Sequence, residues 1–268
     1  MKNSIELISI GTELLSGRTL NTHAQTLGAV LSEIGLSLSR DTTIPDSIKT
    51  IQSAVREAFE RVDIVIVSGG LGPTSDDITR EALAALFNRD IVSSPSALEE
   101  IKKRYAARGY PMNPASERMA LIIEGAETLI NSAGAAAAQR LDPETGKTLF
   151  VVPGPPNEFA AVLNDHIVPW LRKNFPDAVP LELRVLTTQG IGESAIVTLL
   201  ENSTFQCSPA LPVLSEAEGR ELEGELSIGF YPGFGRVEIR LTAPKKKAAL
   251  LDQTERTLRK LLHDHLID

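Results

Sequence analysis

The sequence has 268 residues, of which 42% are hydrophobic and 23% charged, as in folded proteins of one or two domains. Its formal net charge of −8 excludes a broad basic surface for nucleic acid or anionic lipid. The single cysteine, Cys207, excludes an intramolecular disulfide, and no run of about 18 apolar residues could span a membrane. The start, MKNSIELISIGTE, lacks the pattern of a signal peptide because Glu6 interrupts its short apolar run. We therefore expect a cytoplasmic protein.

Apolar runs alternate with helical patterns over the first two thirds of the chain. Strands are predicted at 5–10, 36–44, 63–67 and 149–152, and helices at 21–34, 48–59, 77–87, 94–107 and 157–174. The strand at 63–67 is rich in β-branched residues, as expected when helices cover both faces of a sheet. This order predicts a doubly wound α/β domain with a mostly parallel sheet, which we place at residues 1–175.

A second region begins near Phe175, where FPDAVP supplies two prolines and a turn. Its pattern predicts a strand at 181–188, a helix at 192–200, a hairpin of 226–231 with 236–243, and a terminal helix at 245–266. Residues 215–225, SEAEGRELEGE, indicate a solvated acidic loop. We expect residues 176–268 to form a second, smaller α+β domain.

Polar loops follow three of the predicted strands. GTELLSGRTLN follows the first strand, SGGLGPTSDD follows the strand at 63–67, and PGPPNE follows the strand at 149–152. Ligands of open parallel sheets bind beyond the carboxyl ends of the strands, and glycines let backbone amides approach an anion. Adjacent carboxylates beside a phosphate require a divalent cation between them. The loops together therefore indicate a phosphate-bearing ligand and a metal ion.

Structural interpretations of the same acidic residues stay open at this point. Thr74 and Asp77 have the spacing of a capping box, in which Asp77 would only close the start of a helix. Glu158 at another helix start would be explained by the helix dipole alone. The glycine pattern is neither a Walker A loop nor a dinucleotide-binding fingerprint.

The remaining reactive residues offer weaker signals. The histidines are scattered and are interpreted as surface residues rather than zinc ligands: His23, His166, His263 and His265. Cys207 has no sequence context of a catalytic nucleophile. The second region lacks a G-x-x-G clamp, so we expect no nucleic-acid partner.

Four motifs, taken together and in order, resemble the CinA-like (competence/damage-inducible protein) family. They are GTELLSG with Asn21, SGGLGPTSDD-x-T at 68–79, Asn113 with Arg118, and PGPPNE at 153–158. The resemblance implies a domain over about 1–175 that is similar to the molybdopterin-binding domains of molybdenum-cofactor biosynthesis. GIGES at 190–194 and VEIRLTA at 237–243 resemble the KH-type domain that follows in this family. The C-terminal deamidase domain of full-length relatives, which acts on nicotinamide mononucleotide, is not expected in this chain.

The resemblance also implies an activity, the metal-dependent hydrolysis of a nucleotide-sugar diphosphate, specifically of ADP-ribose to AMP and ribose 5-phosphate. Asp77, Asp76 and Glu158 are then the expected catalytic residues and ligands of a divalent metal ion, and a monovalent cation is a second candidate cofactor. The alternative is a non-catalytic module that binds molybdopterin or a nucleotide and has a regulatory role. The positions expected to bind the small-molecule ligand lie in the loops: Gly11, Glu13, Asn21, Ser68, Gly69, Gly70, Gly72, Thr74, Thr79, Asn131, Gly134, Pro153 and Gly154. The resemblance further suggests a homodimer with no membrane partner.

Two departures from the family pattern affect these expectations. Asp76 stands where molybdopterin-binding relatives often carry a basic residue, which argues against simple pterin binding. NSAGAAAA at 131–138 replaces a family loop of roughly Asn-Pro-x-Gly-Thr-Ala-Pro-Gly, so Ala135 replaces a threonine and Ala138 a glycine. Consecutive alanines favour helix, and glycine matters wherever φ must be positive. We therefore expect ligand binding to survive with weaker hydrolysis.

Overall fold

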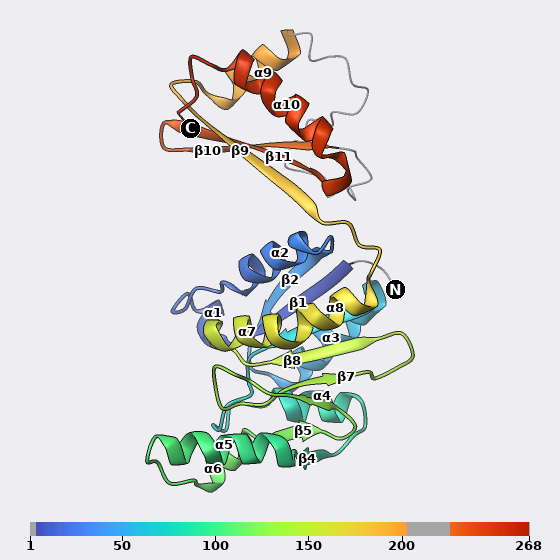
Figure 1. Cartoon of the computed structure of the whole chain (residues 1–268). Coiled ribbons are helices and arrows are strands. Elements are labelled where there is room, and N and C mark those ends of the chain that lie inside the picture. The colour runs from blue at the N-terminus through green and yellow to red at the C-terminus, as the bar shows by residue number, and fades with distance from the viewer. Residues whose placement is uncertain (1–3, 203–225, 268) are drawn as a thin grey trace. The chain divides into compact units, whose positions relative to one another are not determined.

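The computed structural model describes residues 4–202 and 226–267, and the chain divides into two compact units (Figure 1). The first unit comprises residues up to 178 except 33–35, and the second comprises 33–35 with the residues from 179 on. The loop predicted at 215–225 and Cys207 lie outside the described residues.

A six-stranded sheet organises the first unit, in the order β2–β1–β3–β8–β7–β6. Its four parallel strands are β2 (Ser37–Ile44), β1 (Ser4–Ile10), β3 (Ile64–Ser68) and β8 (Thr148–Val152). The antiparallel strands β7 (Ala138–Leu141) and β6 (Glu127–Leu129) continue one edge. The mostly parallel sheet confirms the predicted α/β class.

Helices follow each of the four parallel strands. They are α1 (Thr12–Leu15), α2 (His23–Glu33), α3 (Ile48–Arg61), α4 (Thr79–Leu86), α5 (Pro95–Ala107), α6 (Pro114–Arg118), α7 (Pro156–Val162), the π-helical turn η1 (Leu163–Ile167) and α8 (Val168–Asn174). From β1 the chain crosses through α2 to β2 on one side, and α3 returns it to β3 on the other side of β1. Because such crossovers are right-handed, α2 and α3 cover opposite faces of the sheet.

The core of the first unit follows from these crossovers. All residues of β3 and β8 are buried, which explains their continuous apolar sequences. The amphipathic helix α3 buries Ile51, Val55 and Ala58 in the same apolar cluster as Val65 of β3. A small antiparallel pair, β4 (Ile91–Ser93) with β5 (Leu121–Ile123), lies outside the main sheet. The sequence did not predict β4 to β7, because runs of three or four residues show no readable periodicity.

An antiparallel sheet organises the second unit, in the order β10 (Ser227–Gly233), β11 (Arg236–Pro244) and β9 (Leu181–Gln189). The helices are α9 (Glu193–Asn202) and α10 (Ala248–Leu261), the latter after a 3₁₀ turn, η3 (Lys245–Lys247). Leu186, Ile239 and Leu258 are fully buried in its core. The predicted terminal helix at 245–266 was too long, since Leu266 instead bridges to Thr188 of β9. This smaller region with an antiparallel sheet confirms the second part of the predicted fold class.

None of the helices in 4–202 and 226–267 combines the length and the apolar character that crossing a membrane requires.

Candidate functional site

A cavity of about 530 Å³ lies where β1, β3 and β8 end. The carboxyl ends of parallel strands meet at one edge of a sheet, so the three loops predicted to bind a ligand lie together there. The volume falls in the usual range for a small-molecule site, roughly 300–1,000 Å³. Predicted site residues that line the cavity are Gly11, Glu13, Asn21, Ser68, Gly69, Gly70, Gly72, Asp76, Asp77, Pro153, Gly154 and Glu158. Thr74, Thr79, Asn131 and Gly134 are not among the lining residues.

The turn after β3 has its carbonyl groups directed to the start of α4. Thr79 donates its hydroxyl to the Gly69 carbonyl at 2.8 Å and its amide to the Gly70 carbonyl at 3.3 Å. Arg80 donates to the Leu71 carbonyl at 2.9 Å and to the Gly72 carbonyl at 3.1 Å. In a trans peptide the N–H points opposite to the C=O, so the amides of 70–72 point away from Thr79 and Arg80. Within the described residues, no hydrogen bond uses these amides.

Two positions of this turn require glycine. Gly69 has φ of 106° and Gly70 has φ of 66°, in the left-handed region that side chains disfavour. A Cβ at Gly69 would overlap the carbonyl oxygen of Ile10, and a Cβ at Gly70 would overlap the Thr79 hydroxyl. The double glycine is therefore needed for the shape of the turn, before any ligand is considered.

Two predicted ligand-binding hydroxyl groups already have partners in the protein. Ser68 is buried and donates to the Pro153 carbonyl at 3.0 Å, which ties the loop after β3 to the loop after β8. Thr79 is fully buried, and its hydroxyl is bonded to Gly69. Both side chains shape the site, while their donors point into the protein.

Asp77 closes a turn that precedes α4. Its Oδ2 accepts hydrogen bonds from the Thr74 amide at 2.8 Å and the Thr74 hydroxyl at 2.6 Å. The helix predicted from 77 begins at Thr79, and its N-cap residue, Ile78, has no side-chain cap. Asp77 thus makes one contact of a capping box without capping the helix. The pKa of the exposed Asp76 carboxyl is lowered, mainly by the Thr74 hydroxyl. The backbone amide of Asp76 makes a smaller contribution in the same direction.

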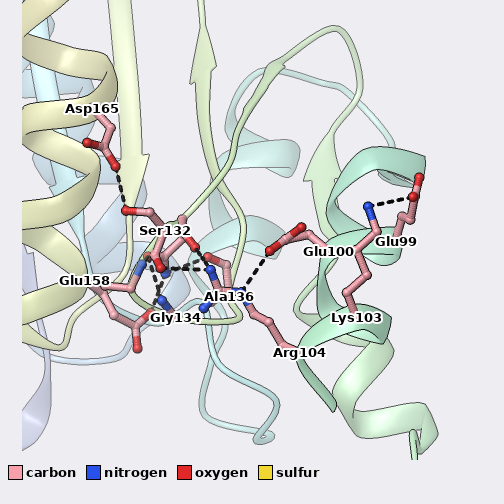
Figure 2. Close-up of polar contacts among 11 residues, drawn as sticks. Glu99, Glu100, Lys103, Arg104, Ser132, Gly134, Ala136, Glu158 and Asp165 are labelled. Carbon is pink, nitrogen blue, oxygen red and sulfur yellow. Dashed lines mark hydrogen bonds and ion pairs between the residues drawn. The ribbon is translucent and has the colours of Figure 1, made fainter. Parts of the chain in front are cut away.

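Glu158 is held by the loop at 131–136 (Figure 2). Asn131 donates from Nδ2 to Glu158 Oε2 at 2.5 Å and to the Ala136 carbonyl at 3.2 Å. Its Oδ1 accepts from the amides of Ala133 at 3.1 Å and Gly134 at 3.0 Å. Through these hydrogen bonds, the buried Asn131 holds the turn together and also binds Glu158, which lines the cavity.

Neighbouring helices anchor the same loop (Figure 2). Arg104 of α5 donates to the carbonyls of Asn131 at 3.0 Å and Ser132 at 2.8 Å, and its Nε lies 3.3 Å from Glu100. On the other side, the Ser132 hydroxyl donates to Asp165 of η1 at 2.6 Å.

The alanines of this loop do not form the helix that their propensity favours. Ala135 and Ala136 line the cavity, whereas Ala138 is fully buried and begins β7. Asn88 is the sole residue other than glycine with positive φ in the part of the chain that the structure describes. Ala138 therefore does not occupy a position that requires glycine.

Acidic side chains contribute to the lining of the cavity. Three of them lie against glycines, where a Cβ would collide with the carboxylate: Glu13 on Gly11, Asp77 on Gly72 and Glu158 on Gly134. With Asp46 and Asp76 the lining includes five carboxylates, and it includes no Lys or Arg among the described residues. No three His, Cys, Asp or Glu residues in 4–202 and 226–267 lie close enough to form a metal site. Asp76, Asp77 and Glu158 thus share one cavity without forming a ready-made metal site.

Two titratable residues of the cavity lining, Asp46 and His23, were not predicted from the sequence. Asp46 accepts hydrogen bonds from the Thr12 amide at 2.8 Å and from the Thr12 hydroxyl at 2.9 Å, which fixes the loop after β1. The N-cap of α3 is Ser47, without a side-chain bond. The sequence could not predict this contact, because Thr12 and Asp46 are 34 positions apart.

His23 is the second of these residues, and its interpretation as a surface histidine was wrong. The side chain is 6% exposed, lines the cavity and stacks on Phe159 with ring centroids 4.2 Å apart. Burial lowers the pKa of His23, against a smaller opposing effect of the Gly154 backbone. His166 is half-buried, and its Nε2 lies 2.8 Å from the Ile130 carbonyl oxygen.

Comparisons with known proteins identify the first unit. Residues 6–173 match the family described as "Probable molybdopterin binding domain". Competence-damage inducible proteins of Shouchella clausii and Moorella thermoacetica are 35% and 36% identical over 97% of this chain, which spans 60% of their length. The crystal structure of CinA from Thermoplasma acidophilum is 34% identical, with 65% of this chain and 99% of that chain covered and a TM-score of 0.57.

These matches correct the expected activity. The matched family is described by molybdopterin binding, and the relatives named above are described as competence-damage inducible or CinA proteins, not as hydrolases. The prediction of an ADP-ribose pyrophosphatase was therefore wrong. The identity over nearly the whole chain and the domain match establish that the protein belongs to the CinA-like family and carries its molybdopterin-binding-like domain.

Proposed function

We propose that the first unit is a binding module for the phosphate group of a pterin or nucleotide, held in the cavity together with a divalent cation. The observation that carries this proposal is the turn after β3. The amides of 70–72 point away from α4, no hydrogen bond within the described residues uses them, and these residues line the cavity. Successive free amides on one side of a turn form a concave site for an anion. The family match supports a pterin as the first candidate ligand.

A cation explains how a phosphate can bind beside so many acids. The cavity lining has five carboxylates and, among the described residues, no Lys or Arg, so a bare phosphate would be repelled. Mg²⁺ is usually bound through one or two carboxylates and the oxygens of a substrate phosphate. That arrangement needs no cluster of three protein ligands, and the exposed, ionised Asp76 and the half-buried Asp77 are the proposed protein ligands. In this arrangement, the cation that binds with the ligand supplies the positive charge that a basic residue at position 76 would otherwise supply.

The rest of the cavity has an apolar part that can contact the ring of such a ligand. Apolar side chains contribute to its lining, among them Leu14, Leu20 and Pro156, and Leu20 is 81% exposed. A heterocycle that covered this surface would remove apolar area from water, at about 25 cal/mol per Å².

Calorimetric titration of the purified chain tests this proposal. The probes are AMP and neopterin triphosphate, with adenosine and neopterin as matched ligands without phosphate, each in Mg²⁺ and in EDTA. The phosphorylated forms should bind at least about tenfold more tightly in Mg²⁺, and EDTA should remove this advantage. Equal affinity for the forms with and without phosphate would contradict the proposed site, as would the absence of any binding.

A homodimer and a cytoplasmic location remain predictions from resemblance and composition. Light scattering that gave 28.9 kDa, the mass of one chain, at micromolar concentration would contradict the dimer.

A further inference from the structure

Arg80 is a buried, charged residue that has no role in the proposed site as described above. Its side chain is among the largest fully buried ones of the described chain. Nη1 and Nη2 donate to the carbonyls of Leu71 and Gly72 at 2.9 and 3.1 Å, and Nε has no hydrogen-bond partner among the described residues. A buried guanidinium is costly unless a carboxylate pairs with it. Within the described residues, no carboxylate makes an ion pair with Arg80.

The charges around Arg80 leave it only partly compensated. Burial lowers the pKa of Arg80, the charges of Glu81 and Asp77 raise it, and the charge of Arg118 lowers it. Glu81 is itself paired with Arg118 at 3.1 Å, and Asp77 is bonded to Thr74. An arginine stays protonated in proteins, so a positive charge lies behind the turn of 69–72.

We propose that Arg80 is the positioning residue for the phosphate in this cavity. This inference rests on the proposed function. The two-pronged contact fixes the Leu71–Gly72 peptide with its carbonyl toward Arg80, and therefore with the Gly72 amide on the opposite side. The guanidinium charge lies behind the turn and offsets part of the repulsion between the acidic lining and a phosphate. Arg80 acts through the turn and does not touch the ligand.

Two substitutions separate this role from simple loop support. Arg80→Met removes both the charge and the hydrogen bonds. Arg80→Lys keeps the charge, but an ammonium on a flexible stem does not reproduce the planar fork. Lys147→Met is the control, because Lys147 donates to the carbonyls of Phe59 and Val62 at 2.7 and 3.0 Å, pairs with Asp63 at 3.0 Å and does not line the cavity.

The experiment measures AMP and adenosine affinity in Mg²⁺ by following backbone amide shifts of 70–72 in ¹⁵N-labelled protein. Arg80→Met should bind AMP about tenfold more weakly, Arg80→Lys should recover part of that loss, and adenosine affinity should change little. Lys147→Met should bind both ligands like the wild type. Circular dichroism reports whether each variant folds. If Arg80→Met is unfolded, the comparison of Arg80→Lys with the wild type tests the inference. Arg80→Lys is then expected to bind AMP about threefold or more weakly than the wild type.

The outcomes distinguish the two proposals. Folded Arg80 variants that bind AMP as tightly as the wild type would overturn the inference and leave the proposed function standing. An equal loss for adenosine would also overturn it, because a disordered cavity would then be the cause. A wild-type protein that binds neither AMP nor neopterin triphosphate would overturn the proposed function, and the inference with it.

Discussion

Replacing Asn131 by alanine should destabilise the first unit more than its position in a loop would suggest. The substitution removes two donor bonds, to Glu158 and to the Ala136 carbonyl, and two acceptor bonds, from the amides of Ala133 and Gly134. Asn131 is 3% exposed, so water would not readily replace these partners. The loop would then lose its contact with the carboxylate at the cavity.

The magnitude follows from these four contacts. A neutral hydrogen bond contributes about 1 kcal/mol net to stability, and one to a charged group about 1.5–3 kcal/mol. Adjacent bonds are not additive and Glu158 is half-exposed, so we expect a loss of about 3 kcal/mol in the free energy of unfolding. For a unit of this size, such a loss lowers the melting temperature by roughly 6–12 °C.

Urea unfolding of wild type and Asn131→Ala measures the effect. Asn113→Ala is the matched control, because Asn113 caps α6 through a local bond to the Ser116 amide at 2.8 Å, worth about 1 kcal/mol. A double-mutant cycle with Glu158→Gln should give a coupling energy of about 1 kcal/mol for the contact between Asn131 and Glu158. If Asn131→Ala costs no more than the control, or if the coupling is zero, our account of this loop is wrong.

Three further predictions concern single residues of the first unit. Ala138→Gly should lower the free energy of unfolding by about 1 kcal/mol, because Ala138 is fully buried in β7; a rise in stability in urea would contradict this. Ala135→Thr adds a hydroxyl donor to the cavity lining and should strengthen AMP binding by about 0.5–1.5 kcal/mol, and an unchanged calorimetric affinity would place this residue away from the phosphate. Burial lowers the pKa of His23, so its contribution to stability is complete above about pH 6.5 and is lost as the pH falls through the lowered folded-state value. His23→Phe keeps an aromatic ring against Phe159 and should show a smaller loss of melting temperature between about pH 7.5 and about pH 5.5 than the wild type; an equal loss would show that His23 does not cause it.

The main layout of the first unit can be read from the amino-acid sequence alone. Long apolar runs and helical periodicity depend on neighbours in the chain, so β1, β3, β8 and α3 could be read with small errors at their ends. The positions of the three loops at the carboxyl ends of strands followed from the parallel order alone. For the same reason, Glu13, Asp77 and Glu158 could be placed near one cavity before the structure was known.

The contacts that each of these residues makes depend on the fold and could not be read from the sequence. Asn131 meets Glu158 across 27 positions and Thr12 meets Asp46 across 34, and no spacing in a single sequence encodes such pairs. The burial of His23 depends on Phe159, which is brought to it by the packing of a distant helix. The sequence suggested that the glycines let backbone amides approach an anion. The structure shows a second reason for them, because a Cβ at these positions would collide with carboxylates or with neighbouring backbone. Hydrogen bonds and close contacts act over a few ångströms of space, and the fold alone decides which residues come that close.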